Sequence, residues 1–515
     1  MQKIQTEVLV IGSGFGAAAP ALRLSQAGFE VLIIEKGKNI VPEKDFKQTQ
    51  DPKYLLQYLK GMSSNTVSFT YAEALGGGSG FYEMISLRAP SLVFEQVDRN
   101  RKRLWPSGVD HRTLDPFYEM AERMLQVEQI AEEEIPKTGV VFSVLMKNLG
   151  YSCDRARYAV KGCIGSGYCV SGCVFGAKQS LHYNYLPQAK QAGAQVLTDI
   201  EALSIKPLES NLESTKACRS VSALPYRYLI HCRSKNGEEL TIQSKIVILG
   251  CGTVGTAKLL LSSRAYLTSL SEQVGKNIAF NGSVKVAGLL PEGFIEGDML
   301  SGRSHPGVIS YQFLESMGIT ISAAKPLPLQ LVSAAHLILE GEKRNPAHWG
   351  EANVELMKLY RRKMIVLYAL GLTPPSAEIR EISQNNYKPY LGVGNELSTY
   401  YQRVKTLLQA ILTKNGCKII QAHAINREGE EYEDIHFSTS HMVGSCRMAE
   451  KRRDGVVDVY GEVFNYPGLY VTDGAAIPSS LAVNSSLTIL ANAERIAHQL
   501  TKWYIKSDVV QAQVN

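Results

Sequence analysis

Residues 438–448 read STSHMVGSCRM and place a single histidine, His441, in a loop-like stretch rich in glycine, serine and cysteine. Histidine titrates close to neutral pH, so its side chain in such a loop can take a proton from a reacting group. The ordinary alternative is a histidine that packs in a turn or a core, and the chain has ten histidines. The stretch alone does not distinguish these interpretations, so the rest of the chain must decide.

Three cysteines in the stretch CIGSGYCVSGCVFGAKQS (163–180) form a second group that could do chemistry. Cys163, Cys169 and Cys173 are spaced like three ligands of a ferredoxin run, but Ser166 and Val174 replace its second cysteine and its proline. Three thiolates could still hold a three-iron cluster, whereas structural zinc usually needs four protein ligands. We therefore expect a tight loop without metal, and an iron–sulfur cluster is the alternative.

The N-terminal residues indicate a nucleotide-binding unit. An apolar run, EVLVIG (7–12), precedes a glycine-rich turn and a helix-compatible stretch, and FEVLIIE (29–35) follows as a second strand. Gly12, Gly14 and Ala17 fill the pattern G-x-G-x-x-G/A, which brings backbone N–H groups and a helix N-terminus to a pyrophosphate. Glu35 ends the second strand, where a carboxylate can bind ribose hydroxyls. This unit predicts a dinucleotide site and suits FAD and NAD equally.

Three later segments repeat parts of this pattern. They are YAEALGGGSGFYEMISLR (71–88), SKIVILGCGTVGTAKLLLSS (244–263) and GLYVTDG (468–474), and a helix follows the last of these from near Asn484. A strand that ends in Asp473 and Gly474 before a helix offers another edge to phosphates. A strand near residue 470 that joins the sheet formed by the N-terminal residues is typical of FAD enzymes, whereas simple NAD domains do not need such a strand.

Length and composition limit the remaining possibilities. At 515 residues the chain is long enough for two domains, and a net charge of +6 argues against nucleic acid as the main partner. Nine cysteines are too sparse for a disulfide scaffold and favour a reducing compartment. The N-terminus shows no secretion signal, and the longest apolar stretch (364–372) is about half of what a membrane helix needs. We expect a cytoplasmic protein with no transmembrane segment.

Together these segments resemble the glucose–methanol–choline (GMC) oxidoreductase family of flavoenzymes, most closely its cholesterol oxidase branch. The pieces that carry the resemblance are GSGFGAA with Glu35, LGGGSG, WPSGVDHRTLDPFYEMAE, VILGCGTVGTAKLLLSS, VGKNIAFNG, HMVGSCRM and LYVTDGAAIPSSLAVNSSLTILANAER. The resemblance implies an α/β fold in which a Rossmann-like FAD-binding domain carries a second, sheet-based substrate-binding lobe. We expect residues 1–100, 180–290 and 435–515 in the FAD-binding domain, 101–179 in a connecting insertion with the cysteine loop, and 291–434 in the substrate lobe.

The resemblance also implies the reaction, in which a CH–OH group of an apolar alcohol is oxidised by hydride transfer to N5 of non-covalently bound FAD. His441 matches the family's catalytic histidine and Asn484 its partner, so we expect a general base and an oxygen-positioning donor. The expected cofactor contacts are Gly12, Gly14, Phe15, Gly16, Glu35, Lys36, Gly77, Gly78, Ser79, Ile200, Gly252, Asp473, Gly474, Asn484 and Ser485.

Three departures from the family pattern bear on this expectation. Tyr82 stands where a family asparagine lies near the flavin, and Ser485 replaces the proline after Asn484. The stretch ISAAKPLP (321–328) lacks the glutamate that isomerises the steroid product in the cholesterol oxidase branch. The substrate therefore need not be a sterol.

Two other functions stay open from the sequence. One is a dehydrogenase with flavin and an iron–sulfur cluster that passes electrons to a partner protein. The other is a flavin-binding electron-transfer protein that turns over no alcohol. The final electron acceptor could be oxygen, a quinone or a protein.

Overall fold

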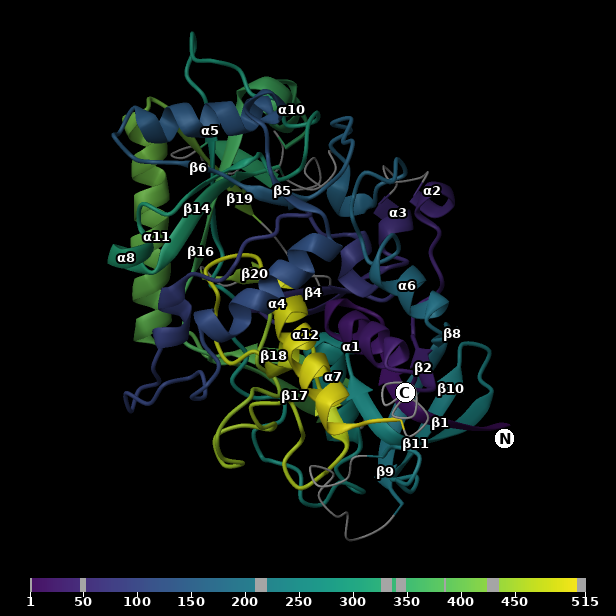
Figure 1. The fold of residues 1–515 in the computed structure, drawn as a ribbon. Coiled ribbons are helices and arrows are strands. Elements are labelled where there is room, and N and C mark those ends of the chain that lie inside the picture. Colours follow the sequence, from purple (N-terminus) through teal and green to yellow (C-terminus); the bar gives the residue numbers. More distant parts are fainter. Residues whose placement is uncertain are drawn as a thin grey trace.

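The computed structural model describes residues 2–46, 52–208, 220–325, 336–339, 349–383, 386–423 and 435–506. Two seven-stranded sheets form its framework, and in Figure 1 the first lies at the lower right and the second at the upper left. Helices of the first domain lie between them in this view.

The first sheet has a parallel core with an antiparallel extension. The strand order is β8 (Gln195–Leu197), β2 (Val31–Ile34), β1 (Gln2–Ile11), β11 (Glu239–Leu249), β10 (Tyr228–Ser234) and β9 (Ile200–Pro207). β21 (Leu469–Val471) pairs in parallel with the C-terminal end of β11, next to the segment that pairs with β10. β10 is antiparallel to both of its neighbours. This parallel core confirms the predicted α/β fold with a Rossmann-like first domain.

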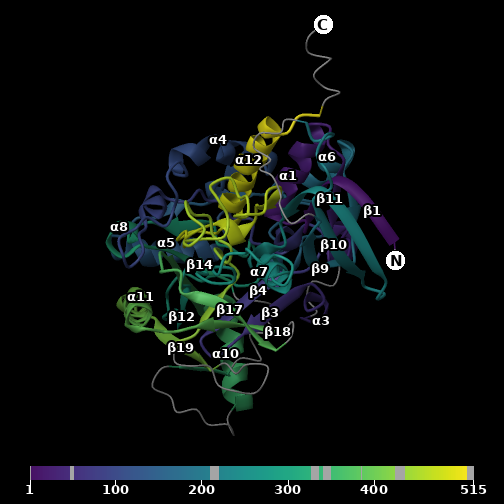
Figure 2. The same ribbon diagram turned by 90° about the horizontal axis from the view of Figure 1, so that it is seen from below.

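Helices from both ends of the chain pack together on this domain. α12 (Ser486–Trp503) lies between α1 (Phe15–Gln26) and α4 (His111–Met124), as Figure 2 shows, and α6 (Tyr185–Gln191) contacts α1. A buried carboxylate ties three of them together, because Glu494 accepts hydrogen bonds from Arg23 at 2.8 Å and from the Tyr185 hydroxyl at 2.7 Å. The C-terminal helix is therefore part of the first domain's core.

The second sheet is antiparallel throughout. Its order is β15 (His336–Leu339), β19 (Lys418–His423), β12 (Val284–Leu289), β16 (Met364–Gly371), β14 (Ile319–Ala324), β13 (Val308–Ser310) and β6 (Asp154–Arg155). β12 precedes the predicted start of the substrate lobe at residue 291, and β6 comes from the predicted insertion. The second sheet thus takes a strand from each of the neighbouring segments, because strand pairing depends on edges that only the folded chain presents.

Two long helices cover parts of this sheet. α11 (Asn395–Lys414) lies along one face, where Leu412 packs over Gly288 and Tyr400 over Gly371. α10 (Trp349–Lys363) contributes Leu356 and Tyr360 to a smaller core with Met364.

Shorter elements complete the fold. They are α2 (Pro42–Asp45), α3 (Pro52–Leu55), β3 (Leu59–Ser63), β4 (Val67–Ala72), β5 (Val127–Gln129), α5 (Lys137–Lys147), β7 (Arg157–Ala159), α7 (Gly252–Ser262), α8 (Leu314–Met317), β17 (Ala377–Ser383), β18 (Asn386–Leu391) and β20 (Phe437–Thr439). β20 pairs in parallel with β4, which fixes the backbone immediately before His441.

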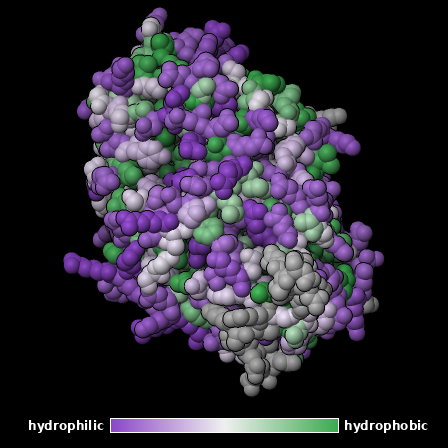
Figure 3. All heavy atoms as spheres, viewed as in Figure 1, coloured by the Kyte–Doolittle hydropathy of each residue, from purple (hydrophilic) through white to green (hydrophobic). Residues whose placement is uncertain are grey.

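The surface seen in Figure 3 is mostly hydrophilic, with hydrophobic side chains scattered across it. Within the part of the chain that the structure describes, every helix is too short or too polar to cross a membrane.

Candidate functional site

The carboxyl ends of the parallel strands meet at one edge of the first sheet. The Gly12 N–H donates to the Ile34 carbonyl at 2.8 Å, and the Gly250 N–H donates to the Ile11 carbonyl at 2.8 Å. The Thr472 N–H continues the series with a 3.1 Å bond to the Leu249 carbonyl. Ligands of open α/β sheets bind outside this edge.

Glycines let the turns at this edge approach one another at backbone distance. A Cβ atom on Gly12, whose φ is +96°, would lie 2.4 Å from the Gly250 carbonyl oxygen. A Cβ on Gly16 would lie 2.3 Å from the Cα of Asp473. The two glycine-rich turns also meet, since a Cβ on Gly77 would lie 3.0 Å from the Cα of Gly14. A side chain at any of these positions would push the turns apart and block a pyrophosphate from their backbone N–H groups.

Glu35 is buried beside these turns and holds two of them together. Its carboxylate accepts hydrogen bonds from the Ser13 hydroxyl at 2.6 Å and from the Gly37 N–H at 2.8 Å. The Ser13 hydroxyl in turn accepts from the Gly76 N–H at 2.9 Å. Burial raises the pKa of Glu35 to about 7, and its two hydrogen bonds oppose that rise. Each carboxylate oxygen keeps a further lone pair, so these residues fit the ribose and pyrophosphate of a dinucleotide.

Asp473 lies at the same edge, but protein groups occupy both of its oxygens. They accept from the Gly252 N–H at 2.7 Å, the Thr256 hydroxyl at 2.6 Å and the Ala475 N–H at 2.8 Å. Burial raises the pKa of Asp473 to about 6. The side chain thus fixes the start of α7 and the short 3₁₀ turn that begins at Gly474.

The remaining expected contacts lie around the same turns. Phe15 packs edge-on against Tyr82 at 5.2 Å between ring centroids, and Lys36 forms ion pairs with Glu73 and Glu201, each at 3.1 Å. The Ile200 N–H donates to the Glu35 carbonyl at 2.9 Å. Gly77, Gly78 and Ser79 lie in a 3₁₀ turn, and Ser485 directly precedes the long helix α12.

The structure brings His441 and Asn484 together. The Nδ2 atom of Asn484 lies 3.1 Å from Nε2 of His441. The His441 N–H donates to Thr439 Oγ1 at 2.9 Å, which joins the histidine to the end of β20. Since an amide nitrogen can only donate, Nε2 of His441 accepts this bond and carries no proton.

Residues of the second sheet region hold the loop before Asn484. Asn281 donates from Nδ2 to the Val483 carbonyl at 2.8 Å and accepts at Oδ1 from the Leu481 N–H at 2.7 Å. The Thr320 hydroxyl donates to the Ala482 carbonyl at 2.5 Å. Sequence reasoning did not identify either residue as functional, although Asn281 lies in VGKNIAFNG, one of the segments that carry the family resemblance.

Burial controls the protonation of the histidine. It lowers the pKa of His441 to about 4, and the charge of Lys285 lowers it further. The ring is therefore neutral at ordinary pH, and the Nε2 lone pair points to the Asn484 amide.

Comparison with known proteins identifies the family. Residues 6–281 and 395–493 match the N-terminal and C-terminal parts of the GMC oxidoreductase family. The chain belongs to the GMC oxidoreductases. It is an FAD-dependent oxidoreductase, and the resemblance predicted from the sequence is confirmed.

Named relatives cover almost the whole GMC chain. A cholesterol oxidase from Acinetobacter baumannii is 24% identical over 95% of this chain and 93% of its own length. The long-chain-alcohol oxidase FAO4B from Arabidopsis thaliana is 26% identical over 97% of this chain and 67% of its own length. Among solved structures, formate oxidase from Aspergillus oryzae RIB40 has a TM-score of 0.65 at 14% identity, covering 98% of this chain and 99% of that one.

The cysteine loop of this GMC chain lies beside the first domain. Lys178 is buried and donates to the carbonyls of Gly80, Tyr82 and Cys169, so it ties the loop to the glycine-rich turn. The Tyr82 hydroxyl donates to the Gln179 carbonyl at 3.3 Å, and its ring packs on Phe15. Across the described residues, no group of three histidine, cysteine or acidic side chains could hold a metal ion.

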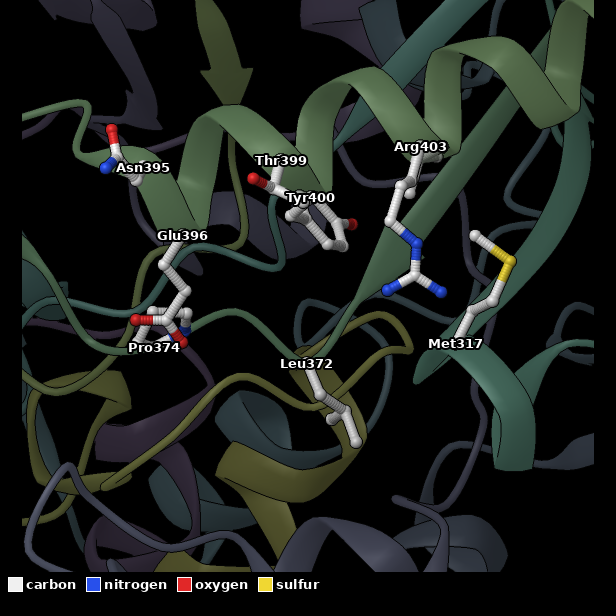
Figure 4. A pocket seen from close by; sticks show the side chains of 9 residues that line it. Met317, Leu372, Pro374, Asn395, Glu396, Thr399, Tyr400 and Arg403 are labelled. Atoms are coloured by element: carbon white, nitrogen blue, oxygen red, sulfur yellow. The ribbon is translucent and has the colours of Figure 1, made fainter.

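A separate cavity of about 460 Å³ opens beside α11 and contains none of the expected site residues. Figure 4 shows Tyr400 and Arg403 projecting from α11, with Met317 and Leu372 on the facing segments. The Tyr400 hydroxyl donates to the Gly282 carbonyl at 2.9 Å, next to Asn281.

Proposed function

We propose that this GMC oxidoreductase oxidises an alcohol of largely apolar skeleton to the carbonyl compound, with His441 as general base and Asn484 as the donor to the substrate oxygen. The observation that carries the proposal is the 3.1 Å contact between Nε2 of His441 and Nδ2 of Asn484. The relatives named cholesterol oxidase and long-chain-alcohol oxidase support an alcohol as the substrate.

The pair provides the two functions that alcohol oxidation needs from the protein. When bound, FAD supplies the acceptor for the hydride that leaves the carbinol carbon. A substrate hydroxyl that replaces the direct hydrogen bond between the two side chains can donate its proton to Nε2 of His441 and accept a hydrogen bond from Nδ2 of Asn484. As the hydride leaves, the hydroxyl becomes strongly acidic, so a base with a pKa of about 4 can still take its proton. The Asn484 amide stabilises the negative charge on the oxygen during this transfer.

The proposal includes non-covalent FAD. Residues 76–88 contain no histidine that could form a covalent link. Acid precipitation of the purified protein should leave the yellow colour in the supernatant. A yellow pellet would contradict the proposal, and His182 would then be the residue to substitute, because its ring lies 2.6 Å from the position of a Cβ on Gly76.

Anaerobic reduction of the bound flavin by a panel of alcohols tests the function directly. At least one primary or secondary alcohol should bleach the flavin spectrum and yield the matching aldehyde or ketone. A protein that keeps its flavin and is bleached by dithionite but by no alcohol would instead be an electron-transfer flavoprotein. Mixing the reduced protein with oxygen or a quinone then identifies the acceptor, which we propose to be one of these or a partner protein.

A further inference from the structure

Lys285 lies on a central strand of the second sheet and points away from the helix that covers it. β12 has β19 on one side and β16 on the other. Gly288 packs against Leu412 of α11, and because side chains alternate along a strand, the buried Val284 and Val286 share that face. Lys285 therefore projects from the opposite face, and it is exposed although both of its neighbours are buried.

Polar groups of neighbouring strands extend this face. Lys285 is directly opposite Tyr368 on β16, and Tyr368 is directly opposite Ser322 on β14. The three side chains thus form a row across three adjacent strands. The Ser322 hydroxyl continues the row to Nε2 of His305 at 3.1 Å.

This face of the second sheet contacts the loop before Asn484, because Thr320, two residues before Ser322 on β14, donates to the Ala482 carbonyl. Asn281, four residues before Lys285, binds the same loop at Leu481 and Val483. The positive charge of Lys285 acts on two groups there, lowering the pKa of His441 and opposing the rise that burial causes in the pKa of Glu83. Glu83 follows the glycine-rich turn at 77–80, and His441 pairs with Asn484. Lys285 therefore lies within electrostatic reach of both walls of the proposed reaction site.

Lys285 differs from the two other lysines near Glu83. Lys178 donates to three backbone carbonyls, and Lys325 donates to the Ser301 carbonyl. Within the described ranges, no hydrogen bond or ion pair engages the Lys285 ammonium. The protein around the Lys285 ammonium displaces water from it and lowers its pKa, and the charge of Glu83 opposes that fall without forming an ion pair with the lysine. An anionic group of a bound ligand could therefore form an ion pair with the Lys285 ammonium.

We propose that Lys285 binds a carboxylate group of the substrate, so that the natural substrate is a hydroxy acid with an apolar skeleton. The Lys285 ammonium, with the Tyr368 side chain directly beside it, matches the single charge of a carboxylate, whereas the buried Ser322 hydroxyl already donates to the Val308 carbonyl at 2.6 Å. This inference rests on the proposed alcohol oxidation and adds the substrate class to it.

Matched pairs of probes test the substrate class. Each ω-hydroxycarboxylate, from hydroxyacetate to hydroxyhexanoate, is compared with the primary alcohol of the same chain length in anaerobic flavin reduction by the holoenzyme. At least one acid should reduce the flavin about 10- to 100-fold more efficiently than its neutral partner, the gain typical of a charge-assisted hydrogen bond. Equal efficiency, or a preference for the neutral alcohols, would overturn the inference.

Substitutions then assign the preference to Lys285. Lys285→Met should abolish the preference for the acid while reduction by the neutral alcohol persists, and Lys285→Arg should retain most of it. Lys147→Met is the matched control, because it removes the same charge from the exposed end of α5. If Lys285→Met reduces the rate of flavin reduction equally for the acid and the neutral alcohol, Lys285 acts on His441 or the flavin, and the inference is wrong. If Lys285→Met binds no flavin, the test uses Lys285→Arg and the parent protein, and both should still prefer the acid to the neutral alcohol. If no alcohol of either kind reduces the parent flavin, the proposed function itself fails.

Discussion

The side chains of His441 and Asn484 meet at 3.1 Å although 43 positions separate them in the chain. The two residues flank β21, and each is held from a different side. Thr439 binds the backbone of His441, whereas Asn281 and Thr320 bind the loop before Asn484. The pair therefore depends on correct packing between the first domain and the second sheet.

His441→Ala should slow flavin reduction by substrate about 10²- to 10⁴-fold, the usual contribution of a positioned general base. Asn484→Ala should cost about 10²- to 10³-fold, as the loss of one donor to a developing oxyanion does. Anaerobic stopped-flow reduction, with flavin content measured for each variant, checks both values. If His441→Ala retains its flavin and is reduced as fast as the parent, His441 is only a loop histidine.

Flavin reduction should depend on pH through His441. Because the pKa lies near 4 and below the ordinary value of 6.5, the neutral base is fully present at neutral pH and is lost as pH falls through about 4. The rate should thus be level above about pH 6 and fall in acid. In Lys285→Met the inflection should move upward, since the lysine charge contributes to the shift. An inflection near 6.5 in the parent would contradict the burial of this ring.

Glu35→Ala should weaken FAD binding by about 1.5–3 kcal/mol, the value of a hydrogen bond to a charged acceptor. Glu35→Gln is the matched control, because it keeps the shape and one acceptor oxygen while removing the charge. Flavin retention during dialysis, followed by absorbance, measures the difference. Unchanged flavin occupancy in Glu35→Ala would argue against a ribose contact.

Gly16→Ala should reduce both flavin content and thermal stability. A Cβ at this position would lie 2.3 Å from Asp473, which cannot move without losing its bonds to α7. Overpacking of this kind costs typically about 1–3 kcal/mol. Gly394→Ala is the control, because nothing lies within 4 Å of its added Cβ. Equal melting temperatures for the two variants would show that the turn at Gly16 can relax.

The cysteine loop should hold no iron–sulfur cluster. Ser166 replaces the cysteine that a ferredoxin run would have, and we expect protein purified without oxygen to contain neither iron nor sulfide in stoichiometric amounts. Colorimetric assays of both elements check this. Stoichiometric iron and sulfide that disappear in Cys169→Ser would move the function toward a dehydrogenase coupled to a partner protein.

The fold of the first domain and its dinucleotide-binding edge were predictable, because the residues that indicate them lie close together in the sequence. Gly12, Gly14 and Glu35 lie within one strand–turn–helix–strand unit, and their spacing alone indicates a dinucleotide edge. His441 and Asn484 were paired only by resemblance to the family. Asp473 was expected to face phosphates, but its bonds to Gly252 and Thr256 depend on a strand pairing between distant segments.

Lys285 shows why the rest could not be predicted. The alternation in VKVAGL is compatible with a strand, but it does not show what the polar face of that strand meets. Tyr368, Glu83 and His441 come from three other parts of the chain, and only the sheet order brings them near the lysine. The stretch 321–328, which lacks the isomerase glutamate, continues past residue 325 outside the described residues.

The insertion of β21 beside β11 has a consequence for biosynthesis. The first glycine turn is made at Gly12, yet the edge it belongs to is completed only by Asp473, 461 positions later (473 − 12). At about 5–20 residues per second, a ribosome needs roughly 20–90 s to cover that distance. The nascent chain therefore cannot close its cofactor edge during most of translation, and flavin insertion becomes one of the last events in maturation.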